Sequence, residues 1–290
     1  MFGTRLLSGI VLVVIAILAL VLGGPVLAGI LMLISLIAFR ELTKALGAVN
    51  HTVTENEKGK TQLGTSPKCG FHVFEILGMI GIVLYYAACY FSNYDTLKLM
   101  CITGVFMAMM FAYVAVFPKH GVEKVISSFF AFIYAPVMLS FVYLTRAVPQ
   151  GIYMVWMIFI SSWGCDTCAY VVGMLIGKKK IFPVLSPKKS LEGCIGGVLG
   201  AALLGGLYGH FFVETAFPEQ SVKWIVAFIC AAGAIMSQVG DLAASAIKRN
   251  HNIKDYGKLI PGHGGIMDRF DSMIVTAPMI YFLTVIMIQF

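Results

Sequence analysis

The sequence predicts an all-α polytopic membrane protein with about nine transmembrane helices. Of its 290 residues, 59% are hydrophobic and 12% are charged, whereas a soluble domain carries about 25% charged residues. The mean hydropathy is +0.88. Apolar runs recur along the whole chain, and most approach the ~20 residues that a helix needs to cross a bilayer. No soluble module remains that could hold nucleic acid, so we expect no nucleic-acid partner.

Nine apolar runs define the expected elements. In chain order they are residues 6–22, 25–39, 72–91, 98–117, 124–146, 151–177, 191–213, 222–247 and 273–290. The first two form an uncleaved helical hairpin rather than a signal peptide, because no clear cleavage site between small residues separates them. The second run is short and the sixth is long, so each either tilts or emerges from the bilayer as ordinary helix.

The spans fall into two groups, which we expect to pack as one continuous bundle. Residues 1–150 hold about five spans and a polar cytoplasmic segment, 41–71, for which we expect a flexible loop or short surface helices. Residues 151–290 hold about four spans and the polar motifs. We therefore expect the chemistry in the second group.

Positive charge predicts the orientation in the membrane. With the N-terminus in the cytoplasm, 18 of the 21 lysines and arginines fall in cytoplasmic segments, and only Lys98, Arg146 and Lys223 fall outside. Cytoplasmic loops of membrane proteins carry such an excess. The split predicts a cytoplasmic N-terminus, an outside C-terminus and an odd number of spans. The basic face would attract anionic lipid head groups and nucleotide phosphates.

Two aspartates lie within predicted spans. Asp241 shares one helix face with Ser237, Ser245 and Lys248, and this stripe leads from the membrane interior to the basic loop that follows. Asp166 lies on a similar polar face of the sixth span. Charged residues at this depth are expensive and usually functional. A solvated helix end for Asp241 and a structural hydrogen bond for Asp166 are the alternatives.

The loop between the sixth and seventh spans is basic. Ser186-Pro187 predicts a turn, and Ser190 is placed to cap the next helix. The N-terminus of that helix, beside Lys188 and Lys189, would bind an anion. The alternative is a loop that only sets topology.

A stripe of small residues follows in the seventh span. It consists of Gly193, Gly197, Ala201, Gly205 and Gly209. Small residues at this spacing let helix backbones approach closely, so we expect a packing seam or a dimer contact.

The densest polar segment is residues 245–271, which carry five basic residues and three aspartates. The basic side chains can neutralise phosphate charge. Its four glycines, at 257, 262, 264 and 265, allow positive φ and close backbone approach, as phosphate-cradling loops need.

The acidic residues of this segment suggest a metal site. Asp268 and Asp271 lie three residues apart at the start of the last span, so both carboxylates would face one way and could share a metal. Asp241 could complete the cluster, and hard oxygen ligands beside phosphates favour Mg²⁺. The residues alone therefore predict an intramembrane enzyme of phosphoryl or nucleotidyl transfer, open to the cytoplasm.

Residues 245–271 resemble the signature of the phosphatidate cytidylyltransferase family. That pattern is Ser-x-apolar-Lys-Arg, four residues, Lys-Asp, a small residue, and then His-Gly-Gly-x-x-Asp-Arg-x-Asp. The chain fits it at Ser245, Lys248, Arg249, Lys254, Asp255, Gly257, Pro261, His263, Gly264, Gly265, Asp268, Arg269 and Asp271. The Asp166-Thr167 pair and the loop 186–190 also resemble family features, whereas the first five spans resemble the family only in being apolar.

The resemblance implies that CTP and phosphatidate react to CDP-diacylglycerol and pyrophosphate. It implies that Asp241, Asp268 and Asp271 bind Mg²⁺ and act in catalysis together with Lys248. The residues expected to bind substrate phosphates are Asp166, Ser186, Lys188, Lys189, Ser245, Arg249, Lys254, His263, Gly264, Gly265 and Arg269. For His263, a loop-ordering hydrogen bond is an alternative. A second, monovalent ion stays open, and the resemblance also implies a homodimer among the membrane lipids.

Two other functions stay open from the sequence. An ion-coupled transporter would use Asp166 and Asp241 as carriers, but it leaves the segment 245–271 unexplained. Another lipid-linked phosphotransferase, such as a polyprenol kinase, is the second alternative. We expect a bacterial inner membrane, because the short N-terminus has no soluble extension, with the active site facing the cytoplasm.

Overall fold

The chain is an integral membrane protein built from helices. The computed structural model describes residues 2–47, 72–92, 94–183, 185–217, 221–259 and 264–288. Within these ranges there is no β-strand, and eight helical segments are long and apolar enough to cross a membrane. A further helix, α1 (Phe2–Leu22), precedes them and is apolar over Val13–Leu22. The prediction of an all-α polytopic fold is therefore confirmed.

The first group of spans contains four candidate membrane crossings after α1. Their elements are α2 (Gly24–Gly47), α3 (Val73–Phe91), α4 (Asp95–Val116), α5 (Val122–Phe132), the π-helical turn η1 (Ile133–Val137) and α6 (Met138–Ala147). The last three form one crossing, and Pro136 lies in its π-helical turn, where the proline interrupts the regular backbone hydrogen bonds.

The second group contains the other four crossings. The first consists of α7 (Gly151–Met154), α8 (Trp156–Phe159), the π-helical turn η2 (Ile160–Gly164) and α9 (Cys165–Ile176), and the second of α10 (Leu191–Tyr208), η3 (Gly209–Val213) and α11 (Glu214–Ala216). The third is α12 (Lys223–Asn250) and the fourth is α13 (Met267–Met287). Because α13 begins at Met267 and not at 273, Asp268 and Asp271 are both helical.

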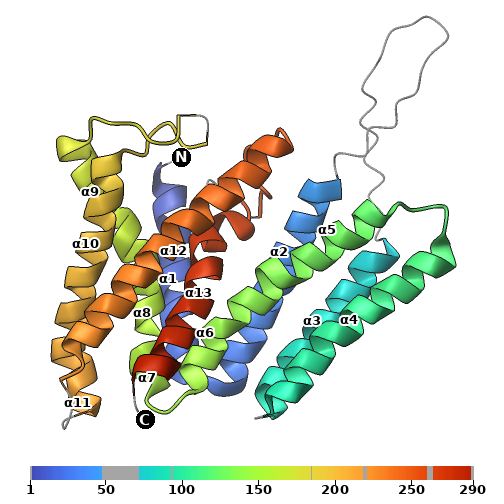
Figure 1. The fold of residues 1–290 in the computed structure, drawn as a ribbon, viewed down its shortest axis with the longest axis horizontal. Helices are drawn as coiled ribbons and strands as arrows, with labels where there is room; N and C mark the ends of the chain where they lie inside the picture. Colours follow the sequence, from blue (N-terminus) through green and yellow to red (C-terminus); the bar gives the residue numbers. More distant parts are fainter. Residues whose placement is uncertain are drawn as a thin grey trace, which may run out of the picture.

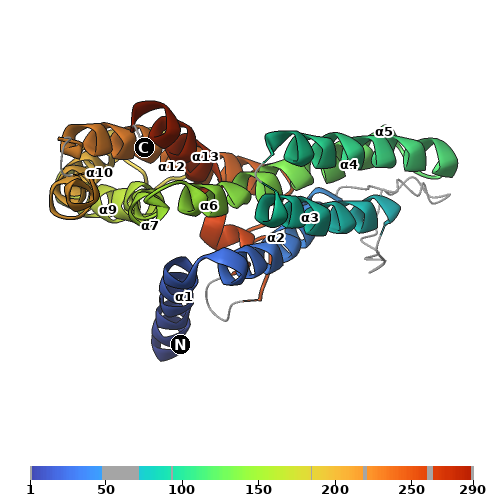
Figure 2. The same ribbon diagram turned by 90° about the horizontal axis from the view of Figure 1, so that it is seen from below.

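The helices form an elongated layer in which the last two spans are central. Figure 1 shows α9 and α10 at one end and α3 and α4 at the other, with α12 and α13 between them, and the two chain ends lie on opposite sides of the layer. The perpendicular view in Figure 2 shows α1 projecting from the other helices. One cluster of buried hydrophobic side chains joins both groups of spans, including Phe39, Phe132, Ile229 and Ile274. The two groups of spans therefore share one hydrophobic core.

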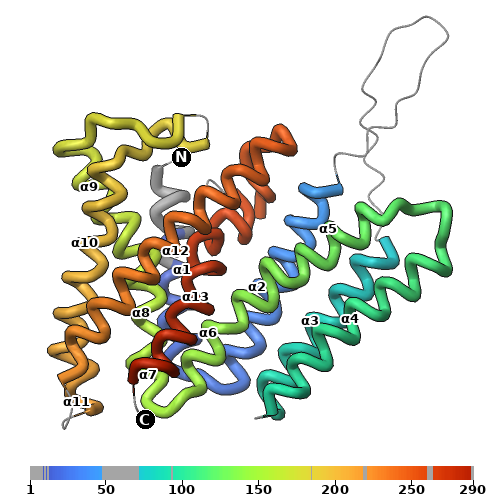
Figure 3. The backbone as a smooth tube through the Cα atoms, in the orientation of Figure 1, coloured from blue at the N-terminus to red at the C-terminus, as the bar shows by residue number. Residues whose placement is uncertain are grey.

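The second span is longer than the sequence suggested. Residues 41–47, expected in a polar loop, continue α2, and the rest of the expected loop lies outside the described residues. The reason is local: Ala38, Leu42 and Ala45 continue the apolar helical face, and all three are buried. Figure 3 traces α2 past α5 and α6, and its last turns reach the start of α13.

The stripe of small residues is a packing seam inside the chain. Gly193, Gly197, Ala201 and Gly205 are all buried in α10. A Cβ added to Gly197 would lie 2.9 Å from the Ala169 Cβ of α9, and one added to Gly205 would lie 2.6 Å from the Cys230 Cβ of α12. The stripe therefore lets α10 approach both neighbours and fixes the walls around the polar residues of α9 and α12.

Replacing Gly197 by valine should destabilise the protein by about 1–3 kcal/mol, because the added methyl groups overpack the seam. The midpoint of thermal unfolding in detergent measures the effect. Gly104→Val is the control, since a Cβ at Gly104 meets nothing within 4 Å. Equal midpoints for the two variants would show that the seam tolerates larger residues.

Candidate active site

The polar residues of α9, α12 and α13 meet in one cavity of about 360 Å³. Its lining holds five aspartates and two basic side chains besides Trp163 and Ser272. These charged residues are Asp166, Asp241, Lys248, Asp255, Asp268, Arg269 and Asp271. The excess of carboxylates over cations makes the cavity suited to a bound cation, and the two basic side chains in its lining can contact an anion.

The polar stripe of α12 leads into this cavity, as its spacing predicts. Asp241 forms an ion pair with Lys189, with 2.5 Å between Lys189 Nζ and Asp241 Oδ2. Further along α12, Lys248 Nζ lies 2.9 Å from Asp268 Oδ1. The two lysines come from different elements, the 178–190 loop and the end of α12, so aspartates of the cavity pair with both basic segments of the sequence.

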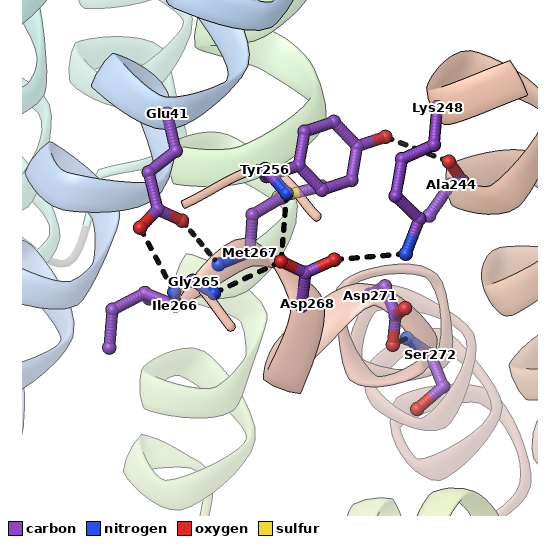
Figure 4. A network of polar contacts seen from close by, with 10 residues as sticks. All are labelled: Glu41, Ala244, Lys248, Tyr256, Gly265, Ile266, Met267, Asp268, Asp271 and Ser272. Atoms are coloured by element: carbon purple, nitrogen blue, oxygen red, sulfur yellow. Dashed lines mark hydrogen bonds and ion pairs between the residues drawn. The ribbon is translucent and has the colours of Figure 1, made fainter. Parts of the chain in front are cut away.

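Among the cavity carboxylates, Asp268 accepts the most hydrogen bonds from the described residues. Its side chain is 3% exposed, and its Oδ1 accepts from Lys248. Its Oδ2 accepts from the backbone N–H groups of Tyr256 (2.8 Å) and Gly265 (3.0 Å) (Figure 4). Asp268 therefore ties the two described ends of the segment 256–265 to the first turn of α13.

Tyr256 contacts both α12 and the Lys248 side chain. Its hydroxyl donates to the Ala244 carbonyl at 2.9 Å, and its ring lies 5.4 Å from Lys248 Nζ. Burial raises the pKa of the Tyr256 hydroxyl well above its usual range. The side chain therefore stays a neutral hydrogen-bond donor at physiological pH, and its ring offers the lysine a cation–π contact.

The loop before α10 has the local structure that its sequence predicts. The Ser186 carbonyl accepts from the Lys189 N–H, which closes a turn, and the Ser190 side chain accepts from the Gly193 N–H as a helix cap. Lys188 is exposed, and its carbonyl accepts from Lys180 Nζ. Both lysines of this loop, Lys188 and Lys189, are expected to bind phosphate. In the structure Lys189 pairs with Asp241 of the cavity lining, whereas Lys188 is exposed.

The cavity gathers some of the predicted site residues and not others. Six of them line it: Asp166, Asp241, Lys248, Asp268, Arg269 and Asp271. Those outside the lining are Ser186, Lys188, Lys189, Ser245, Arg249, Lys254, Gly264 and Gly265, of which Lys189 pairs with the lining residue Asp241. Arg249 and Lys254 are exposed at the end of α12 and just beyond it. His263 lies outside the described residues.

The glycines of residues 245–271 differ from the expectation. Of the described ones, Gly264 has a positive φ of 84°, whereas Gly257 and Gly265 do not. Gly262 lies outside the described residues. Conformational freedom therefore accounts for Gly264, and the other two require a different reason, which lies in α2.

Sequence reasoning missed Glu41, a residue of α2. Its carboxylate accepts from the backbone N–H groups of Ile266 (3.2 Å) and Met267 (2.9 Å) at the start of α13 (Figure 4). The signal was an acidic residue within the apolar helical face of Ala38, Leu42 and Ala45. Assigning 41–71 to a loop concealed it.

The carboxylates fit Mg²⁺ by the type of donor, although they do not form a closed cage. Within the described ranges, no three His, Cys, Asp or Glu side chains lie close enough to hold one metal ion together. Asp241, Asp268 and Asp271 nevertheless line the same cavity and supply the oxygen ligands that Mg²⁺ prefers. Because lysines pair with Asp241 and Asp268, binding of a metal by these two would require Lys189 and Lys248 to move toward other anions.

Comparison with known proteins identifies the family. A model of the Cytidylyltransferase family matches residues 3–287. The chain belongs to this family. The signature residues that converge on the cavity are therefore those of a cytidylyltransferase family member, and the transporter alternative is not favoured.

Curated relatives carry one shared name, phosphatidate cytidylyltransferase. The protein from Staphylococcus haemolyticus is 30% identical over 97% of this chain and 98% of its own length. The protein from Staphylococcus saprophyticus is 36% identical over 52% of this chain, and the match spans 56% of that relative. The protein from Bacillus subtilis is 35% identical over 49% of this chain and 51% of its own length.

Asp268 and Asp271 should differ in their contribution to stability. Asp268→Asn leaves one acceptor oxygen where Lys248 and two backbone amides need two, so we expect a loss of about 1.5–3 kcal/mol. Asp271→Asn keeps an oxygen for its bond to the Ser272 N–H and removes one negative charge from an acidic cavity. Its thermal midpoint in detergent should equal or exceed that of the unaltered protein. A midpoint for Asp271→Asn as low as that of Asp268→Asn would contradict this distinction.

Proposed function

We propose that this cytidylyltransferase family member transfers the cytidylyl group of CTP to phosphatidate, giving CDP-diacylglycerol and pyrophosphate. The observation that carries the proposal is the convergence of Lys248, Asp268, Arg269 and Asp271 with Asp241 on one cavity at the end of α12. Asp241 and Lys248 belong to α12, whereas Asp268, Arg269 and Asp271 belong to α13. All of them except Asp241 are part of the signature in residues 245–271. The relatives named above support the same reaction.

The basic side chains provide the contacts for phosphate. Lys248 and Arg269 line the cavity, and Lys189 reaches it through Asp241. A substrate phosphate would compete with Asp241 and Asp268 for the two lysines, since a phosphate offers several charged oxygens to the same donors. Arg269 has a planar set of donors suited to bidentate contact with a phosphate.

The acidic side chains provide the contacts for metal. We assign Mg²⁺ to Asp241, Asp268 and Asp271, and when bound the ion would neutralise charge on the phosphates of both substrates. A second, monovalent ion stays a prediction. In the reaction, a phosphate oxygen of phosphatidate attacks the α-phosphorus of CTP, a new P–O bond forms, and the bond to pyrophosphate breaks. Phosphatidate is already anionic near neutral pH, so the chain needs only to position the two phosphates and offset their charge.

The proposal also covers how the two substrates reach the cavity and which side of the membrane it faces. Lipid would enter sideways between apolar helices and CTP from the cytoplasm, as the distribution of basic residues suggests. We propose a bacterial inner membrane with the cavity facing the cytoplasm. A homodimer remains a prediction from the family resemblance.

Purified protein with labelled CTP, Mg²⁺ and phosphatidate should form CDP-diacylglycerol and release pyrophosphate. Replacing phosphatidate by a polyprenol should give no labelled product, because a polyprenol lacks the attacking phosphate. If the protein shows a thermal unfolding transition, and is therefore folded, but forms no CDP-diacylglycerol, the proposed function is overturned.

Asp241→Asn should raise the Mg²⁺ concentration for half-maximal rate by about 10- to 100-fold, because the neutral amide is a weaker ligand for a hard cation. Asp95→Asn is the matched control: Asp95 pairs with Lys98 at the start of α4 and is far from the cavity lining. An unchanged Mg²⁺ titration for Asp241→Asn would assign Asp241 a structural role only.

A further inference from the structure

The start of α13 is held by a carboxylate from the other end of the chain. Glu41 is 9% exposed, and its two oxygens accept separately from the N–H groups of Ile266 and Met267. Figure 4 shows the Glu41 side chain extending from α2 toward these amides. The contact crosses more than two hundred residues of sequence, so it links the first group of spans directly to the residues of the cavity.

Two carboxylates share the amides at this helix end. Asp268 accepts from the Gly265 N–H, and Glu41 accepts from the next two, so three successive backbone donors are satisfied by acidic side chains. The first N–H groups of a helix lack partners within the helix, and negative charge is favourable there. Because these amides are taken, the start of α13 is fixed in place and is not itself the anion site of the cavity.

The space that Glu41 occupies explains two glycines of the signature. A Cβ on Gly257 would collide with the Glu41 carboxylate, and a Cβ on Gly265 would collide with both of its oxygens. Neither glycine has a positive φ. Gly257 and Gly265 therefore form a socket for the carboxylate of Glu41, and the absence of a side chain is what the contact requires.

We propose that Glu41 is a positioning residue for the reaction. By holding Ile266 and Met267, it fixes the first turn of α13, from which Asp268 and Asp271 project toward the cavity. It thereby sets where the metal-binding carboxylates and the partner of Lys248 lie. The inference rests on the proposed function for its catalytic meaning, although the contact itself can be tested without activity.

Glu41→Gln tests the contact with the smallest change in volume. The amide keeps one acceptor oxygen and places an NH₂ group against the second backbone donor, so one of the two hydrogen bonds is lost. We expect kcat to fall about 10-fold and the half-saturating Mg²⁺ concentration to rise by a similar factor, with the KM for CTP less affected. Glu41→Asp, whose carboxylate can accept both bonds after a small shift, should recover part of the rate.

Glu75→Gln is the matched control. Glu75 also accepts from a backbone N–H at a helix start, that of His72 at α3, and it does not line the cavity. This variant should keep the rate and the Mg²⁺ titration of the unaltered protein. A normal rate and titration for Glu41→Gln, or a loss fully explained by a smaller folded fraction, would overturn the positioning role.

The socket is tested by combining substitutions. Gly265→Ala should lower the rate in the unaltered protein, but it should add little in a Glu41→Ala background, because the vacated space receives the methyl group. Fully additive losses would contradict the socket.

Hydrogen exchange separates this inference from the proposed function. The peptide covering 264–272 should exchange faster in Glu41→Gln than in Glu75→Gln, whether or not the protein makes CDP-diacylglycerol. Faster exchange in a protein that makes no CDP-diacylglycerol would support the role of Glu41 in holding α13 and would reject the proposed reaction. Unchanged exchange would reject that role of Glu41 even if the protein catalyses the reaction.

Discussion

The site depends on how the first turn of α13 satisfies its backbone amides. A helix start buried among other helices has no water to accept its N–H groups, so protein acceptors must do so. Here Asp268 accepts from the Gly265 N–H, and Glu41 accepts from the N–H groups of Ile266 and Met267. One carboxylate belongs to α13 and the other to α2, so the same hydrogen bonds that cap the helix also fix its position against the first group of spans.

The charge distribution follows from that arrangement. Once the start of α13 is fixed, Asp268 and Asp271 lie in a cavity with Asp166, Asp241 and Asp255. Negative charges that line one cavity repel one another, and nearby cations reduce this repulsion. In the structure Lys189 and Lys248 supply part of that charge through ion pairs with Asp241 and Asp268. In the proposed transfer, a metal ion would replace the lysines at Asp241 and Asp268. The substrate phosphates would then accept from the released lysines.

Packing defines how closely the walls of the cavity approach. The small residues of α10 let it lie against α9 and α12, whose acidic residues face the cavity. Two signature glycines serve the same purpose at the other side, where Gly257 and Gly265 leave room for Glu41. Most of the glycines that matter here therefore act through their lack of volume, and only Gly264 of the described signature glycines uses a positive φ.

The sequence by itself determined the helical class, the order of the spans, the polar face of α12 and the signature around Asp268 and Asp271. These features depend on hydropathy and on spacing within one helix, so they are local and can be read along the chain. It misassigned residues 41–47, because the adjacent charged residues Arg40 and Glu41 interrupted an apolar face that continues through Leu42 and Ala45. Only the tertiary structure decided that Lys189 pairs with Asp241 and that Glu41 holds α13. Such partners are chosen by how distant helices pack, and no local periodicity encodes which carboxylate will meet which helix end.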